Sequence, residues 1–110
     1  MALMVITPMM FMRFSELQVG MLYEWTSTTA SKIRNWTRAN QDDGGPHLKS
    51  YPVLKAHSLF VLLEAVQLPI LNDYYNLYDL KIISPDGTIG WLFLWNKEDS
   101  FPMKEKLACQ

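Results

Sequence analysis

The sequence predicts a single, small, mainly β domain, and two observations carry this prediction. Residues 75–83 and 88–95 show the two-residue alternation and the aromatic and β-branched content that are typical of strands. Between them stands Ser84-Pro85-Asp86-Gly87, whose proline, aspartate and glycine suit successive positions of a tight turn. The chain has 110 residues, of which 49% are hydrophobic and 19% charged, so it can bury one core and is too apolar to be disordered.

The first strand is expected just after Gly20. Residues 14–25 begin as a lead-in, which Gly20 interrupts, and continue as a strand in which Met21, Tyr23 and Trp25 share one face. The polar residues 26–50 follow as a long first loop. Within this loop, residues 31–40 could form a short helical piece, because Ile33 and Trp36 stand three positions apart. Residues 41–46, Gln-Asp-Asp-Gly-Gly-Pro, would end this helical piece, because glycine and proline interrupt regular structure. A loop as long as residues 26–50 is often functional.

The next segments complete the predicted sheet. Residues 58–67 fit a buried strand or a short helix, and we favour the strand because two clear strands follow. In residues 75–83, Tyr78, Leu80 and Ile82 share one face, opposite Asp79 and Lys81. In residues 88–95 both faces are apolar, which predicts either a central strand or a face that meets a partner.

The two ends of the chain are expected to lie outside this domain. Residues 1–13 are predicted to be an N-terminal extension, with Met10 or Met12 as an alternative start, and they lack the pattern of a secretory signal. Residues 14–101 would form the domain, with a single 3₁₀ turn between 96 and 101, and residues 102–110 a C-terminal tail. The one cysteine, Cys109, cannot form an intrachain disulfide, which favours a reducing, cytoplasmic location.

The order of these parts resembles that of a known fold family. The glycine-led first strand Val19-Gly20-Met21-Leu22-Tyr23 precedes a long loop, an apolar strand at 60–66 and the hairpin. This order resembles small SH3-like β-barrels, especially the stand-alone ones of phage genomes. The stretch Asp86-Gly87-Thr88-Ile89-Gly90-Trp91-Leu92 is similar to the D-G-x-x-G-W-V stretch of bacterial SH3-like domains. The resemblance implies a five-stranded SH3-like barrel with a long first loop and a short 3₁₀ or helical turn. It departs from the domains that bind proline-rich peptides, since it lacks their acidic cluster and paired aromatics.

Few residues suggest catalysis or a cofactor. His47 and His57 stand ten positions apart, and no Ser, Cys or Asp lies in a recognised nucleophile context. The pair Asp42-Asp43 precedes two glycines, which is typical of a turn rather than of a calcium loop. We therefore expect a non-enzymatic protein that uses no metal and no cofactor.

Two kinds of binding site remain. The resemblance places an aromatic groove at Trp36, Tyr74, Tyr75, Trp95 and Phe101, and tryptophan and tyrosine commonly anchor protein interfaces. We favour this protein-interaction hypothesis, with self-association as one form of it because the formal net charge is only −1. The alternative is a nucleic-acid-binding barrel that uses the cations and the aromatic ring of one loop: Lys32, Arg34, Trp36 and Arg38. For both hypotheses, the competing interpretation is that these aromatics simply pack against the barrel.

Overall fold

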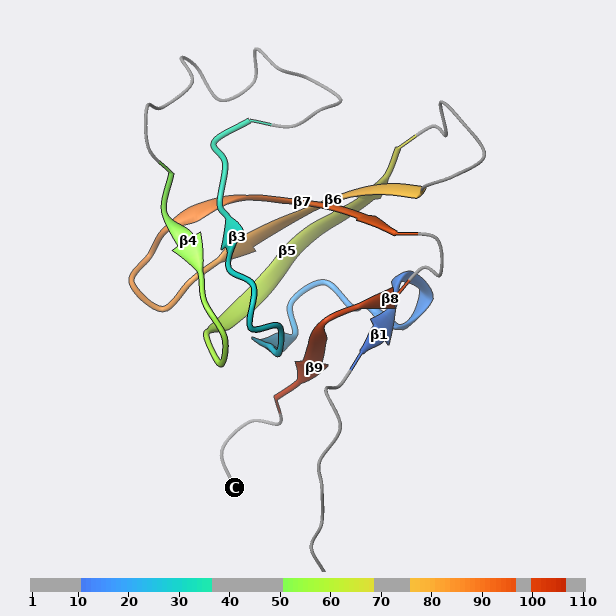
Figure 1. Ribbon diagram of the computed structural model, residues 1–110, viewed down its shortest axis with the longest axis horizontal. Helices are drawn as coiled ribbons and strands as arrows, with labels where there is room; N and C mark the ends of the chain where they lie inside the picture. Colours follow the sequence, from blue (N-terminus) through green and yellow to red (C-terminus); the bar gives the residue numbers. More distant parts are fainter. Residues whose placement is uncertain (1–10, 37–50, 69–75, 97–99, 107–110) are drawn as a thin grey trace, which may run out of the picture.

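The protein is mainly β, and one antiparallel sheet of five strands organises it. The computed structural model describes residues 11–36, 51–68, 76–96 and 100–106. The sheet has the order β7-β6-β5-β2-β9 (Figure 1). Its strands are β2 (Leu22–Trp25), β5 (Leu59–Gln67), β6 (Asn76–Ile83), β7 (Ile89–Asn96) and β9 (Met103–Glu105).

Three smaller elements stand beside this sheet. Strand β1 (Met12–Arg13) pairs with β8 (Ser100–Phe101), and β3 (Ser31–Lys32) pairs with β4 (Val53–Leu54). A single turn of 3₁₀ helix, η1 (Phe14–Glu16), follows β1. Figure 1 shows the β3–β4 pair beside one end of β7, whereas β1 and β8 lie near β9.

The predicted hairpin is confirmed. The Gly87 N–H donates to the Ser84 carbonyl at 2.9 Å, and Gly87 has a φ of +88°, a conformation that glycine adopts without steric cost. Asp86 rigidifies this turn, because its Oδ1 accepts hydrogen bonds from the Ser84 hydroxyl and, at 3.0 Å, from the Thr88 N–H. These two bonds lower the pKa of Asp86 from 3.8 to about 2. Strands β6 and β7 then pair in register from Ile83–Ile89 to Asn76–Asn96.

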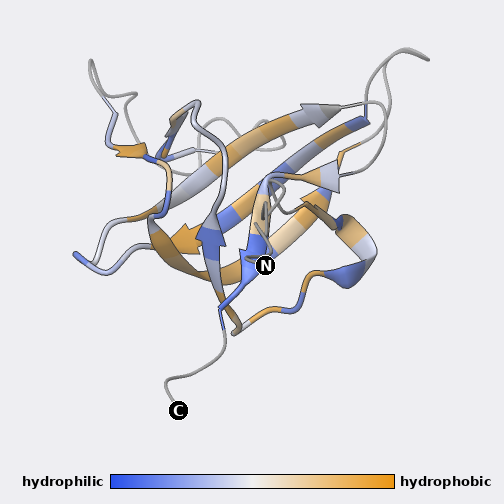
Figure 2. Cartoon of the chain, turned by 60° about the horizontal axis from the view of Figure 1, so that its bottom comes forward, coloured by the Kyte–Doolittle hydropathy of each residue, from blue (hydrophilic) through white to orange (hydrophobic). Residues whose placement is uncertain are grey.

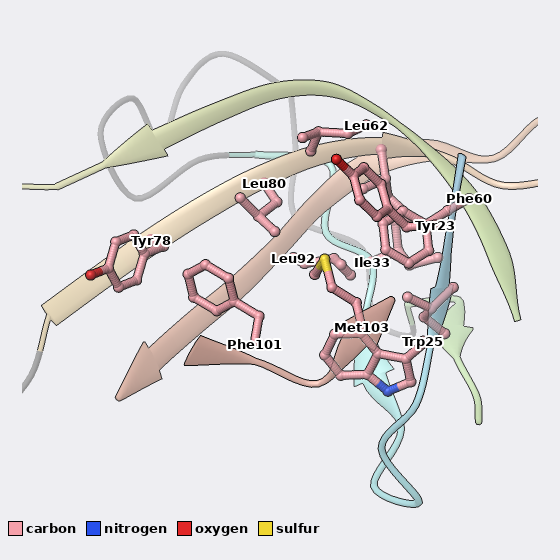
Figure 3. Close-up of a cluster of buried hydrophobic side chains, with 12 residues drawn as sticks. Tyr23, Trp25, Ile33, Phe60, Leu62, Tyr78, Leu80, Leu92, Phe101 and Met103 are labelled. Carbon is pink, nitrogen blue, oxygen red and sulfur yellow. The ribbon is translucent and has the colours of Figure 1, made fainter. Parts of the chain in front are cut away.

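The ambiguous segment 58–67 is a strand. Strand β5 pairs with β2 on one side and with β6 on the other, so both of its edges are hydrogen-bonded. Its register with β6 shifts between Leu62 and Glu64, which marks a β-bulge. Such a bulge bends the strand and increases its twist, and Figure 3 shows the sheet curving over the core.

The core fills the concave side of the sheet. The predicted face of β6 is confirmed, because Tyr78, Leu80 and Ile82 are all buried. The rings of Tyr78 and Phe101 meet edge to face, 4.9 Å apart, at one end of the core (Figure 3). The remaining fully buried apolar side chains come from five other strands: Tyr23, Leu54, Phe60, Leu62, Leu92 and Met103.

The prediction of a closed barrel is not met: over the described residues the sheet stays open, with β7 and β9 as its two edges. Strand β7 is therefore not central in the sheet. Its outer edge is nevertheless partly covered, since Arg34 N donates to Trp91 O at 2.9 Å and Trp91 N donates to Arg34 O at 2.7 Å. Gly90 permits this close approach, because a Cβ there would lie 2.6 Å from the Arg34 oxygen.

The helical piece expected over residues 31–40 is wrong as far as residue 36. Residues 31–32 form β3, the Ile33 N–H donates to the Pro52 carbonyl at 2.8 Å, and the Ile33 side chain enters the core. Pairing with two neighbouring strands thus satisfies backbone groups that a helix would pair internally. Residues 37–40 lie outside the described residues. Of residues 96–101, over which a 3₁₀ turn is expected, residue 96 ends β7 and residues 100–101 form β8, while residues 97–99 lie outside the described residues. The 3₁₀ turn of the described residues is η1 instead.

Strand pairing occurs on both sides of residues 14–101. Residues 103–105, assigned to a tail, form β9, which pairs with β2 and buries Met103 completely. At the other end, Met12 and Arg13 pair with Phe101 and Ser100. In Figure 2 the strands carry both hydrophobic and hydrophilic stretches, coloured orange and blue. The segment 103–105, Met-Lys-Glu, is too short to be predicted as a strand from its sequence.

Candidate functional site

A shallow pocket lies where the open sheet leaves a gap between the end of β7 and the chain that leads into β9. Its volume is about 250 Å³, and we call it the seam pocket. Trp25, Phe93, Leu94 and Pro102 contribute apolar walls. Small residues that follow β2 contribute the opposite side: Ser27, Thr29, Ala30 and Ser31. An apolar pocket with a few hydroxyl groups at its rim is suited to an apolar side chain of a partner.

Trp95 is the residue that gives the seam pocket an accessible aromatic rim. It lines the pocket and is 60% exposed, the largest exposed aromatic side chain among the described residues. The alternation of β7 places it on the same side of the strand as Trp91 and Phe93, which are buried. Tryptophan is enriched among the residues that dominate binding energy at protein interfaces, and Trp95 stands beside an apolar recess.

Phe101, another predicted groove residue, is buried, whereas Trp95 is exposed. It contributes to the lining of the seam pocket, but its side chain is fully buried and its ring packs on Tyr78. Phe101 therefore shapes the floor of the pocket and cannot offer its ring to a partner. Tyr74 and Tyr75 lie outside the described residues.

Trp36 packs against the sheet rather than projecting from it. Its ring meets Phe93 edge to face at 4.8 Å, and its Nε1 donates a 2.9 Å hydrogen bond to the Tyr51 hydroxyl. The Arg34 guanidinium lies over the ring of Phe93, 4.4 Å from its centroid. Lys32 is exposed on β3, and Arg38 lies outside the described residues. The structure thus brings Arg34 and Trp36 together on Phe93.

A charged cluster that the sequence analysis missed lies at the other edge of the sheet. Glu24, on β2, is buried to 9% exposure, and its Oε2 lies 3.1 Å from His57 Nδ1. Lys104 and Lys106 place their Nζ atoms 3.9 Å and 3.7 Å from the two carboxylate oxygens. The hydrogen bond with His57, followed by the charges of the two lysines, lowers the pKa of Glu24 although burial opposes this.

The conformation of His57 supports this contact. His57 has a φ of +67° in the turn before β5, and its N–H donates to the Trp25 carbonyl at 2.7 Å. A non-glycine residue in this region is uncommon, although histidine is enriched there. Alternation in an extended segment 103–106 places Lys104 and Lys106 on one face, but only the pairing with β2 brings them to Glu24.

Metal ligation and membrane spanning were each assessed over the described part of the chain. Among those residues, no group of three or more His, Cys, Asp or Glu side chains is placed to hold a metal ion. None of the helices within the described ranges is long and apolar enough to cross a membrane. The chain matches no known protein-family model, no curated protein and no solved structure.

Proposed function

We propose that this protein is a non-enzymatic interaction module that binds another protein at the seam pocket. The exposure of Trp95 on the rim of an apolar pocket is the observation that carries this proposal. Tryptophan contributes a large apolar area and an N–H donor, and for this reason it is enriched among the residues that dominate binding energy. The partner would insert an apolar side chain between Trp95 and Pro102 and would meet the hydroxyls of Ser27 and Ser31 at the rim.

Site-specific photocrosslinking tests this proposal. A benzophenone amino acid is placed at position 95 in one variant and at position 89 in another, and each is expressed in the source cells. Ile89 is a matched control because it is also exposed, at 54%, and stands on the same strand and face at the other end of β7. A discrete protein adduct from position 95 but not from position 89 supports the proposal. Equal adducts from both positions, or none from position 95, contradict it.

Self-association is one form of the same proposal. If the partner is a second copy, sedimentation equilibrium detects a dimer that the Trp95→Ala variant lacks. Because Trp95 is exposed, this substitution should leave the free energy of unfolding nearly unchanged. A dimer that persists unchanged in the variant places the contact elsewhere.

A nucleic-acid site around Phe93 is the second candidate, and the gathering of Arg34, Trp36 and Phe93 favours it. Exposed Lys32 would add a phosphate contact. The test is an anisotropy titration with labelled single-stranded DNA and RNA at low and at physiological salt. Binding that weakens steeply with salt and is abolished in the Lys32→Glu/Arg34→Glu variant supports this candidate, and no binding at low salt removes it.

The SH3-like class is the finer fold assignment that we propose. In its support, the strands occur in the expected order: a first strand after a glycine, a long polar segment, an apolar strand, and the hairpin. Strand β9 then returns to pair with the first of these strands, β2. An experimental structure that shows the edges of β7 and β9 approaching one another as in a barrel would support the class. A flat sheet with distant edges would contradict it.

A further inference from the structure

An apolar groove that the proposed function does not use lies on the outer face of the sheet. Its volume is about 260 Å³, and Leu22, Val61 and Ile83 line it together with Leu59 and Pro85. The register aligns three of these residues across neighbouring strands, since Leu22 stands opposite Val61 and Val61 stands opposite Ile83. Alternation turns them away from the core, to which the adjacent residues of each strand contribute. We call this feature the outer groove.

Two lysines, Lys104 and Lys106, lie beside this groove and share a single carboxylate, that of Glu24. The Nζ atoms of Lys104 and Lys106 lie 3.9 Å and 3.7 Å from the Glu24 oxygens, beyond the usual 2.7–3.2 Å of a hydrogen bond. Each ammonium group therefore keeps donors for a further acceptor. His57 Nδ1, at 3.1 Å, already occupies one oxygen of Glu24. Two lysines on one carboxylate leave a local surplus of positive charge.

Backbone pairing places the groove and the cations next to each other. Glu24 stands opposite Leu59 in the β2–β5 register, and Lys106 N–H donates to the Leu22 carbonyl at 2.8 Å. Leu22 and Glu24 are two residues apart on one strand and so share its outer face. One surface thus offers an apolar recess with ammonium groups along its side.

We propose that the outer groove docks an extended protein segment that carries a leucine or a phenylalanine flanked by acidic residues. The apolar side chain would enter the recess between Val61 and Ile83, and the flanking carboxylates would pair with Lys104 and Lys106. A peptide fits this surface better than an anionic membrane does, because the apolar residues form a recess rather than a protruding group that could insert among lipids.

The test uses labelled peptides that share one central leucine and differ only in the charge of the flanking residues: acidic, neutral or basic. Fluorescence anisotropy at low salt should show the acidic peptide binding at least about tenfold more tightly than the basic one. Added salt should reduce this difference, since the lysines are solvent-accessible. The Lys104→Gln/Lys106→Gln variant should bind the acidic and the basic peptide with similar affinity. The control is Lys32→Gln, which removes the charge of an exposed lysine on β3. This variant should still bind the acidic peptide more tightly than the basic one.

The groove itself is tested by Val61→Thr, which preserves the shape of the side chain and its strand propensity. This variant should weaken the binding of the acidic peptide several-fold while its thermal unfolding remains cooperative. The proposal is overturned if acidic and basic peptides bind equally, if none binds, or if the double lysine variant retains the preference. Cosedimentation with phosphatidylserine vesicles in the absence of any peptide preference also overturns it, in favour of a membrane surface.

Discussion

The Nε1 of Trp36 donates a 2.9 Å hydrogen bond to the hydroxyl of Tyr51, and these two residues flank the segment 37–50. The Trp36 ring at the same time packs on Phe93 of β7. Both ends of a long polar insertion are therefore fixed to each other and to the sheet. Residues 36 and 51 are thus neighbours in space although fifteen positions separate them in the sequence.

Removing the hydroxyl of Tyr51 should destabilise the protein measurably. Tyr51→Phe leaves the Trp36 N–H without this acceptor, and we expect the free energy of unfolding to fall by about 1 kcal/mol. Urea denaturation checks the value. A double-mutant cycle with Trp36→Phe separates the hydrogen bond from ring packing, and additive effects of the two substitutions would show that the bond contributes nothing.

Gly90 should be sensitive to even one added methyl group. A Cβ at this position would lie 2.6 Å from both the Arg34 oxygen and the Ile33 Cγ2, so the backbone pairing of Arg34 with Trp91 would have to shift. We expect Gly90→Ala to reduce the free energy of unfolding by about 1–3 kcal/mol in denaturant melts.

Gly87 provides the control for this substitution. It has a φ of +88° and nothing within 4 Å of the Cβ position, and asparagine tolerates this backbone conformation. Gly87→Asn should therefore change the stability by less than Gly90→Ala does. The reverse order of the two effects would contradict a tight contact between β7 and Arg34.

Stability should fall in acid through Glu24. Its pKa is lower in the folded protein than the ordinary 4.5, mainly because of the hydrogen bond with His57, so the unfolded chain binds the proton more readily. The stabilisation is complete above the ordinary pKa and is lost as the pH falls below 4.5 and through the lowered value. Urea melts across this range should show a flatter dependence on pH for Glu24→Gln than for the wild type.

Asp86 behaves in the same direction but at lower pH. Its pKa lies near 2 rather than 3.8, so its own contribution to the slope falls between these two values. A Glu24→Gln variant should keep this part of the slope, and Asp86→Asn should remove it. If Asp86→Asn leaves the slope between pH 3.8 and about 2 unchanged, the assignment of this part to Asp86 is wrong.

Truncation should reveal that the sheet extends beyond Phe101. A chain that ends at residue 101 loses β9 and the buried Met103, and loss of a large apolar core side chain alone costs about 2–5 kcal/mol. We expect this chain to be unfolded or to melt at a much lower temperature by circular dichroism. A chain that ends at Lys106 keeps β9 and is the control, which should melt close to the full-length protein.

The parts of the fold that local signals encode were predicted from the sequence. Proline, aspartate and glycine at 84–87 defined the hairpin, and alternation identified the buried face of β6. Residues 31–36 were predicted incorrectly, because the spacing of Ile33 and Trp36 also suits a helix and only pairing with Pro52 and Trp91 decides between the two. Pairing with residues so distant in the sequence cannot be recognised from the residue pattern of 31–36 alone.

The exposure of a candidate site residue likewise depends on contacts that the local sequence does not encode. The resemblance to SH3-like barrels singled out Trp95 as a groove residue, and the structure leaves it 60% exposed. Phe101 gave the same signal but lies in the core, since exposure depends on strand pairing rather than on residue type. The Glu24 cluster combines residues separated by more than 30 positions, and no spacing in the sequence points to it.

The pairing of β2 with β9 has a consequence for the order of folding. The β6–β7 hairpin closes through a short turn, so it can form within microseconds as an isolated event. Strand β2, in contrast, must wait for partners far along the chain, of which Met103–Glu105 are the last to be synthesised. On the ribosome, β2 would emerge long before β9, with one edge uncovered. We therefore expect nascent chains to complete their fold only after residues 103–105 leave the exit tunnel, and to need protection from aggregation until then.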